Sequence, residues 1–210
     1  FRMKKDTYVW HTIHEQNMRH RLTEALCGYH EKYPYRYGMK KAEIHMTYMK
    51  KVKLNVFDLY VEMLSEEGAL KRHQEFLQLP EFEVRKDAVY EKVLKTVQKQ
   101  FEKVQFDFQR FSEISFGNIK REEVEDIMLL LIDEDIVVKI TEDIYTLKSI
   151  IEKAKEVIQN RLKENPLITI AEVRDLLGTS RKSAKPILEY MDSIKVTKKN
   201  GTESERVAYV

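Results

Sequence analysis

The feature that most constrains the fold is one pattern, helices followed by a pair of strands, that occurs three times along the chain. Three segments hold the same place in this pattern, at the end of a helix and the start of a strand: LSEEGALK (64–71), IDEDIVVK (132–139) and MDSIKVTK (191–198). A helix-turn-helix followed by a β-hairpin is a winged helix. The sequence therefore predicts a mainly α chain with small β-wings, an α+β fold of tandem winged-helix domains.

The repeats also predict the domain boundaries. They place winged helices over 11–83, 84–148 and 149–210. The opening segment 1–10 alternates like a strand, and we expect it to be the final strand of a truncated preceding winged helix. The elements expected in the first unit are helices near 11–31, 40–50 and 55–66, and strands at 69–72 and 75–79.

In the middle unit, Asp87 is predicted to cap a long helix, because a short acidic side chain can accept hydrogen bonds from the first free backbone N–H groups. One side of that helix carries Val89, Val93, Val97 and Phe101. The other elements expected there are a short helix over 106–114, a helix over 120–132 and a strand hairpin over 137–147.

The last unit has two segments with the form of a capping box, in which a hydroxyl and a glutamate three residues later satisfy each other's backbone N–H groups. They are Ser149-Ile-Ile-Glu152 and Thr169-Ile-Ala-Glu172. Asn165-Pro166 should end the first helix. The second helix is expected to bury Val173, Leu176 and Leu177.

A turn at Gly178 should lead into a third helix that runs to about Asp192. Residues 196–210 then read as two strands around Asn200-Gly201, a strong turn signal. On the third helix, helical spacing predicts one buried stripe: Ala184, Ile187, Leu188 and Met191.

Three cations, Arg181, Lys182 and Lys185, lie off that stripe and should face water. Free backbone N–H groups and the helix dipole make the start of such a helix a ready site for phosphate. Ser180 is the better candidate for the cap, with Thr179 as the alternative. The cations therefore have two interpretations, a solvated face or a contact for a polyanion.

Pro186 constrains the same helix, because it cannot donate a hydrogen bond to the carbonyl of Lys182. A kink after the first turn would relieve this problem. So would a helix that starts at Ser183, which would place the proline in the first turn, where no donor is needed.

Charge and composition narrow the function. Residues 149–210 carry a net charge of +3 and residues 84–148 a net charge of −3, so an anionic partner is expected on the last unit. The single cysteine, Cys27, cannot form an internal disulfide or a cysteine-based zinc site. The chain has no glycine-rich phosphate loop and no apolar run long enough to span a membrane.

Other candidate sites have simpler explanations. The six histidines all lie within residues 1–83 without metal-ligand spacing, so no metal site is predicted. Tyrosines and cations alternate in YHEKYPYRYG (29–38), which is read as packing of a helix-to-helix turn rather than as an RNA-stacking loop. No catalytic constellation is recognised, and the chain is not expected to be an enzyme.

The stretch EVRDLLGTSRKSAKPILEYMDSIKVTKK (172–199) closely resembles the last winged-helix domain of the bacterial selenocysteine-specific translation elongation factor. Upstream, LCGYHEKYPYRYGMKKAEI (26–44) is similar to the entry of an earlier winged helix in that family. The likeness extends over the whole chain and is strong in the last quarter. Ser183 and Lys185 depart from the family pattern, and the wing is longer at 201–206.

The resemblance implies that the last unit binds a stem-loop in messenger RNA, the selenocysteine insertion element, and tethers the factor to its message during UGA recoding. Together, the pattern and the resemblance nominate eight RNA-binding residues: Arg174, Thr179, Ser180, Arg181, Lys182, Lys185, Lys198 and Lys199. The resemblance further implies a cytoplasmic monomer that acts on the ribosome. GTP and magnesium would belong to an upstream part, with no cofactor on the residues present.

Two other classes of function remain open at this stage. A DNA-binding transcription regulator would place basic helices in a major groove, yet the corresponding helices of the first two units are acidic. A protein-interaction scaffold suits those acidic helices.

Overall fold

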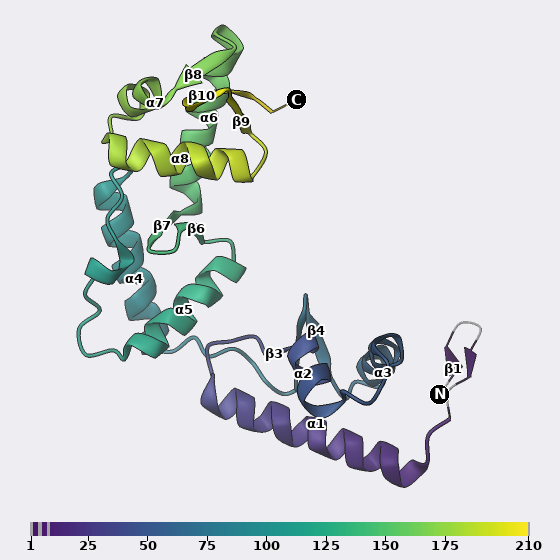
Figure 1. Ribbon diagram of the computed structural model, residues 1–210. Helices are drawn as coiled ribbons and strands as arrows, with labels where there is room; N and C mark the ends of the chain where they lie inside the picture. The colour runs from purple at the N-terminus through teal and green to yellow at the C-terminus, as the bar shows by residue number, and fades with distance from the viewer. Residues whose placement is uncertain (1, 4–5, 8, 210) are drawn as a thin grey trace. The chain divides into compact units, whose positions relative to one another are not determined.

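The computed structural model describes residues 2–3, 6–7 and 9–209, and it divides into two compact units, residues 1–86 and 87–210 (Figure 1). At the start of the first unit, β1 (Arg2–Met3) and β2 (Asp6–Thr7) pair antiparallel with each other. The single strand expected over 1–10 is therefore replaced by two short ones, with Phe1, Lys4, Lys5 and Tyr8 lying outside the described residues.

The rest of the first unit is a winged helix. Its helices are α1 (Thr12–Lys32), α2 (Lys41–Tyr48) and α3 (Leu54–Glu66). Its sheet has the order β3-β5-β4, with β4 (Lys71–His73) and β5 (Phe76–Gln78) as the predicted hairpin and β3 (Met39–Lys40) as an additional strand. One core holds these elements together, with Leu26, Ile44 and Phe57 fully buried.

The tyrosine-rich turn of this unit is structural, as predicted. Tyr35 is buried, and the rings of Tyr29 and Tyr33 pack with their centroids 4.8 Å apart. The guanidinium of Arg36 lies 4.0 Å from the centre of the Tyr33 ring. These contacts fill the connection between α1 and β3.

The second unit begins with α4 (Ala88–Val104), and Asp87 caps it as predicted by accepting from the backbone N–H groups of Val89 and Tyr90. The short helix expected over 106–114 is wrong in extent, because only the 3-10 turn η1 (Phe111–Glu113) is helical. Then follow α5 (Arg121–Asp133) and the hairpin of β6 (Val137–Thr141) and β7 (Ile144–Leu147).

The last winged helix consists of α6 (Lys148–Glu164), β8 (Leu167–Thr169), α7 (Ile170–Leu177), α8 (Arg181–Ser193), β9 (Thr197–Asn200) and β10 (Thr202–Ala208). Its sheet has the order β8-β10-β9. The capping box predicted at Ser149 is wrong. Because β7 leads directly into α6, Leu147 holds the N-cap position and no side chain caps that helix.

One core runs through both winged helices of the second unit. Phe108 and Val138 from the first of them lie in the same buried cluster as Ile158, Ile187 and Leu188 from the second. The predicted boundary between 148 and 149 therefore lies inside one compact unit, at the start of α6.

All three repeated junctions end their helices in the same way. The residue two positions after each helix has a positive φ: 72° at Gly68, 59° at Asp135 and 57° at Lys195. The next backbone N–H then bonds back across the last turn, with distances of 2.8, 2.9 and 2.9 Å for the bonds Ala69 to Leu64, Ile136 to Leu131 and Val196 to Met191. This is the Schellman geometry. In each winged helix it turns the chain from the third helix into the wing.

Candidate nucleic-acid interface

Helix α7, which leads into the turn before α8, is hydrogen-bonded at its own N-terminus. Thr169 and Glu172 form the predicted capping box, with Thr169 N donating to Glu172 Oε2 at 2.9 Å and Glu172 N donating to Thr169 Oγ1 at 3.2 Å. Arg161 on α6 also donates to Glu172, at 2.6 Å. Burial opposes ionisation of Glu172, but the hydrogen bonds from Thr169 and Arg161 outweigh it and hold the carboxyl pKa below its ordinary value.

Gly178 supplies the turn itself, with φ of 59°, a left-handed conformation that favours glycine. Thr179 N then bonds to Arg174 O at 3.0 Å. Of the stripe predicted on α7, Val173 and Leu177 are buried, but Leu176 is 46% exposed, so its assignment to the core is wrong.

Helix α8 presents the face that the sequence predicted. Ala184, Ile187, Leu188 and Met191 are fully buried, whereas Arg181, Lys182 and Lys185 are exposed. The helix begins at Arg181, so the alternative start at Ser183 is wrong and Pro186 lies within the helix. The carbonyl of Lys182 therefore lacks the usual helical donor.

The hydroxyl groups around the start of α8 bind the other winged helix of the same unit. Thr179 Oγ1 donates to Phe106 O at 2.6 Å, and Ser180 Oγ donates to Asp107 Oδ1 at 2.8 Å. The buried Ser183 Oγ accepts from Phe108 N at 3.0 Å. These bonds fix the segment 106–108 against the tip of α8.

Ser180 holds the N-cap position that the sequence predicted for it. Its side chain, however, makes no capping hydrogen bond to the helix. Instead the carboxylate of Asp107 lies at the helix start, within 3.4 Å of Ser183 Oγ as well. A carboxylate there already complements the positive end of the helix dipole. The predicted phosphate site on the free N–H groups of α8 is therefore shared with an acid of the protein itself.

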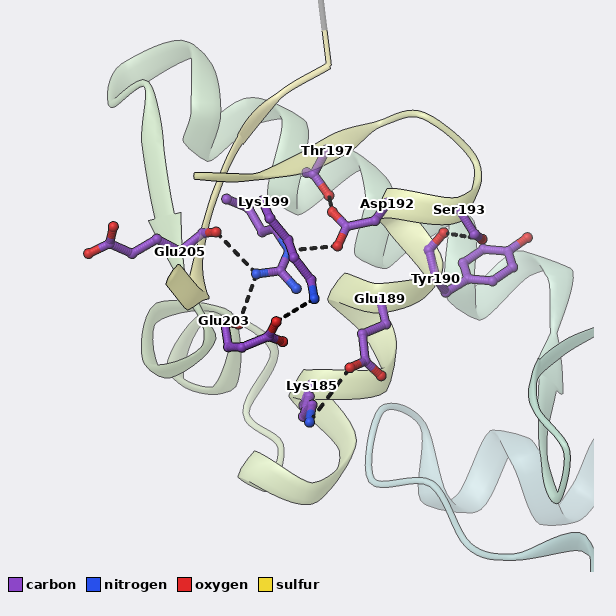
Figure 2. Close-up of polar contacts among 10 residues, drawn as sticks. Lys185, Glu189, Tyr190, Asp192, Ser193, Thr197, Lys199, Glu203 and Glu205 are labelled. Atoms are coloured by element: carbon purple, nitrogen blue, oxygen red, sulfur yellow. Dashed lines mark hydrogen bonds and ion pairs between the residues drawn. The ribbon is translucent and has the colours of Figure 1, made fainter. Parts of the chain in front are cut away.

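Neighbouring acids divide the predicted cations into two groups. Arg174, Lys185 and Lys199 form ion pairs with Asp175, Glu189 and Glu203, at 2.6, 3.7 and 2.6 Å. Figure 2 shows the last two of these pairs. The hydrogen bond from Lys199 lowers the pKa of the Glu203 carboxyl.

Arg181 and Lys182 differ from this group, because within the part of the chain that the structure describes neither forms an ion pair. Lys198 likewise has no acid partner among the described residues and lies 5.9 Å from the centre of the Tyr209 ring. These three side chains can meet an external anion without first releasing a carboxylate.

The position of the wing depends on Arg206, which sequence reasoning missed. Its side chain is 1% exposed, and Nε donates to Asp192 Oδ2 at 2.6 Å. Thr197 Oγ1 donates to the other oxygen of Asp192 at 2.7 Å. Figure 2 shows Asp192, at the end of α8, bonded to Thr197 of β9. One carboxylate thus ties both strands of the wing to the helix.

The long wing contains an irregularity next to the cations. The register of β10 against β9 shifts between Thr202 and Arg206. The residues 203–205 are accommodated by this shift, which places Glu203 against Lys199. A longer wing was noted in the sequence, but the acid that it brings to Lys199 was not.

The corresponding helices of the other two winged helices also begin beside exposed cations, Lys53 at α3 and Arg121 at α5, but they carry acids along their exposed faces. On α5 the exposed side chains include Glu122 and Glu125, and the latter pairs with Arg121 at 3.0 Å. On α3 the exposed residues include Glu62 and Glu66. Both faces would repel a phosphate backbone.

Residues 160–204 and 23–79 each match a family model described as elongation factor SelB, winged helix. A curated relative, the selenocysteine-specific elongation factor of Desulfomicrobium baculatum, is 24% identical over 185 residues that cover 87% of this chain. The chain spans 29% of that relative's length.

Two solved structures share the fold. One is the mRNA-binding domain of elongation factor SelB from E. coli in complex with SECIS RNA, which is 19% identical and is matched over its whole length by 60% of this chain, with a TM-score of 0.50. The other is the bacterial selenocysteine-specific elongation factor EF-Sec, which is 18% identical, with 95% of this chain matching 30% of that one at a TM-score of 0.50.

Proposed function

We propose, from the match of residues 160–204 to a family model of a SelB winged helix, that the last winged helix of this chain binds a stem-loop of messenger RNA, the selenocysteine insertion element. In this proposal the binding tethers the factor to its message during UGA recoding on the ribosome. The observation that supports it best is the pair Arg181 and Lys182, exposed and without ion pairs among the described residues, at the tip of α8.

The physical basis for RNA binding is the charge and the rigidity of this tip. Cations on phosphates supply affinity and orientation, and they release counterions from the nucleic acid. Sequence choice would come from unpaired loop or bulged bases, because side chains cannot read the deep groove of A-form RNA. The bonds from Thr179, Ser180 and Ser183 to segment 106–108 hold the tip in one geometry, which lowers the entropy cost of binding.

The eight nominated residues take different roles in this proposal. Arg181, Lys182 and Lys198 contact the RNA directly. Arg174, Lys185 and Lys199 contact it only by exchanging a carboxylate partner for a phosphate. Thr179 and Ser180 position the tip through Phe106 and Asp107.

The other winged helices would act as a spacer between this RNA contact and the rest of a longer factor. GTP and magnesium would be bound in that other part, and the residues present here would work without a cofactor. The proposed role is RNA binding, which requires neither catalysis by these residues nor contact with a membrane. No helix among the described residues is both long and apolar enough to cross a bilayer.

Titration of hairpin RNA tests the proposal. The wild-type chain and the double variant Arg181→Ala/Lys182→Ala are titrated with a selenocysteine-insertion hairpin and with a scrambled hairpin of equal length, at two salt concentrations. A matched control, Lys99→Ala/Lys103→Ala, removes the same charge from exposed positions on α4 of the same unit.

We expect selective binding by the wild type and by the control. The Arg181/Lys182 variant should bind more weakly, and its salt slope should be smaller by about one for each phosphate that it no longer neutralises. Equal binding of both hairpins by the wild type, or an equal loss of affinity in the control variant, would contradict the proposal. Preference for duplex DNA would favour the regulator alternative, and RNA-independent capture of a protein partner would favour the scaffold.

A further inference from the structure

A second group of cations lies at the opposite end of α8 from Arg181, on the face formed by the end of α6 and the wing. It surrounds a hollow of about 380 Å³. The polar residues that line the hollow are Gln159, Lys163, Lys195 and Tyr209, and the apolar ones are Leu162, Val196 and Ala208. None of the residues that line this hollow was among the eight nominated from the sequence.

The hollow combines an exposed aromatic ring with cations. Tyr209 lines it and is 48% exposed. The ammonium groups of Lys195 and Lys198 lie 6.0 and 5.9 Å from the centre of its ring. At that distance the cations stand at the outer limit of a cation–π contact and remain available to a phosphate.

The charge around the hollow is not neutralised by the protein. Among the residues that the structure describes, no acidic side chain lines it. Lys163 donates to the neutral Asn160 at 3.0 Å, and in the described parts of the chain Lys163, Lys195 and Lys198 make no ion pair. This contrasts with Lys185 and Lys199, which each hold a glutamate.

The backbone holds the hollow open in a defined shape. Tyr209 N donates to Val196 O at 3.0 Å, which continues the pairing of β10 with β9 beyond Ala208. Lys195 takes the left-handed position of the Schellman turn, with φ of 57°. The ring and the cation are therefore both presented by backbone that is already hydrogen-bonded, and little order needs to be created on binding.

We propose that this hollow, named here the Tyr209 site, binds one unpaired nucleotide of RNA, whose base stacks on Tyr209 while Lys195 and Lys163 contact its phosphates. Stacking of an unpaired base on an aromatic ring beside cations is the general mode by which proteins hold single-stranded RNA. The choice of RNA as the ligand rests on the proposed function. The site adds a single-strand contact to the hairpin contact at Arg181.

Short single strands separate this site from the hairpin contact. Fluorescence anisotropy compares the wild-type chain with a labelled tetraadenylate and with an abasic tetranucleotide of the same charge. Removal of one stacked base should weaken binding about fivefold or more. Tyr209→Phe, which keeps the ring, should preserve this difference, and Tyr209→Ala should abolish it.

The cations are tested with Lys163→Gln/Lys195→Gln, where glutamine keeps an unbranched side chain at the left-handed position. This variant should lower the affinity for both oligonucleotides to the same extent, because both carry the phosphates that the lysines contact. Arg181→Ala/Lys182→Ala should lower hairpin selectivity and leave the ratio of tetraadenylate to abasic affinity unchanged.

Two results would overturn the Tyr209 site: equal affinity of the wild type for the two oligonucleotides, or base discrimination that survives Tyr209→Ala. Hairpin selectivity is measured with different RNAs and different variants. A loss of hairpin selectivity would therefore contradict the proposed function and leave the result for the Tyr209 site unchanged. A failure of base discrimination at the Tyr209 site would likewise leave the result for hairpin binding unchanged.

Discussion

The buried guanidinium of Arg206 on β10 donates to the carboxylate of Asp192 at the end of α8, across 2.6 Å. The same guanidinium also donates to the backbone carbonyls of Glu203 and Glu205, at 2.9 and 3.1 Å. Arg206 therefore satisfies both the acid that ends the helix and the carbonyls exposed where the register of the wing shifts. The wing that carries Lys198 and Lys199 depends on this one side chain.

Replacing Arg206 by methionine should lower the free energy of unfolding of the second unit by about 3 kcal/mol, because it leaves Asp192 without its buried partner. Urea unfolding followed by circular dichroism measures the change. Lys199→Met, which breaks an exposed pair on the same wing, should leave stability unchanged. An equal change in the free energy of unfolding for the two variants would show that the buried Arg206–Asp192 pair stabilises the protein no more than the exposed Lys199–Glu203 pair does.

Ser183→Ala should lower the free energy of unfolding by about 2 kcal/mol, because the backbone N–H of Phe108 loses its acceptor in a buried place. Ser193→Ala at the other end of α8 serves as the control, since that hydroxyl is exposed and donates to Tyr190 O, a local bond within the same helix end. Denaturant titration of both variants compares them. The idea fails if Ser183→Ala proves as mild as the control.

Gly38→Ala should destabilise the first unit by about 2 kcal/mol, the usual range for overpacking. A Cβ at this position would lie 2.1 Å from the carbonyl oxygen of Leu77 on β5, so the strand pairing would have to shift. Gly28→Ala is the matched control, because the position is helical and open, and alanine should stabilise it by up to about 1 kcal/mol. Thermal unfolding should move in opposite directions for the two variants.

The first unit should lose stability as the pH falls below neutrality. Burial lowers the pKa of the His30 imidazole from 6.5 to about 4, and its neutral Nε2 accepts from Leu79 N at 3.2 Å. Because the unfolded chain binds this proton more readily, the contribution is complete above pH 6.5 and declines as the pH falls towards 4. It is absent once the pH is below the folded-state value.

Urea unfolding at several pH values between about 7 and 4 checks this expectation for His30. His30→Gln, which cannot titrate, should show a flatter profile than the wild type. His14→Gln at an exposed position should keep the wild-type profile. A wild-type slope that persists in His30→Gln would assign the pH dependence to other groups.

Features whose physical cause lies within a few residues could be predicted from the sequence alone. Asp87 caps α4, Thr169 and Glu172 close a capping box, and Gly178 ends α7 in the left-handed conformation. The spacing of Ala184, Ile187 and Leu188 predicted which face of α8 is buried and hence that Arg181 and Lys182 face water. Local hydrogen bonds and helical periodicity suffice for each of these.

Only the tertiary structure decided what those side chains meet. Strands β3 and β8 are too short to be recognised, and they exist because β5 and β10, far along the chain, supply their partners. Ser149 has capping-box spacing, yet β7 runs directly into its helix. Leu176 continues an apolar pattern, yet no neighbouring element among the described residues covers it.

The candidate site shows the same division. Sequence could nominate Ser180 and Lys199, but it did not show that Asp107 and Glu203 lie against them. Asp107 is 73 residues from Ser180 and meets it only because whole elements pack together. Glu203 is four residues from Lys199 and faces it where the register of the wing shifts. The packing of these elements therefore sets which cations are free for an external anion and which already hold an acid.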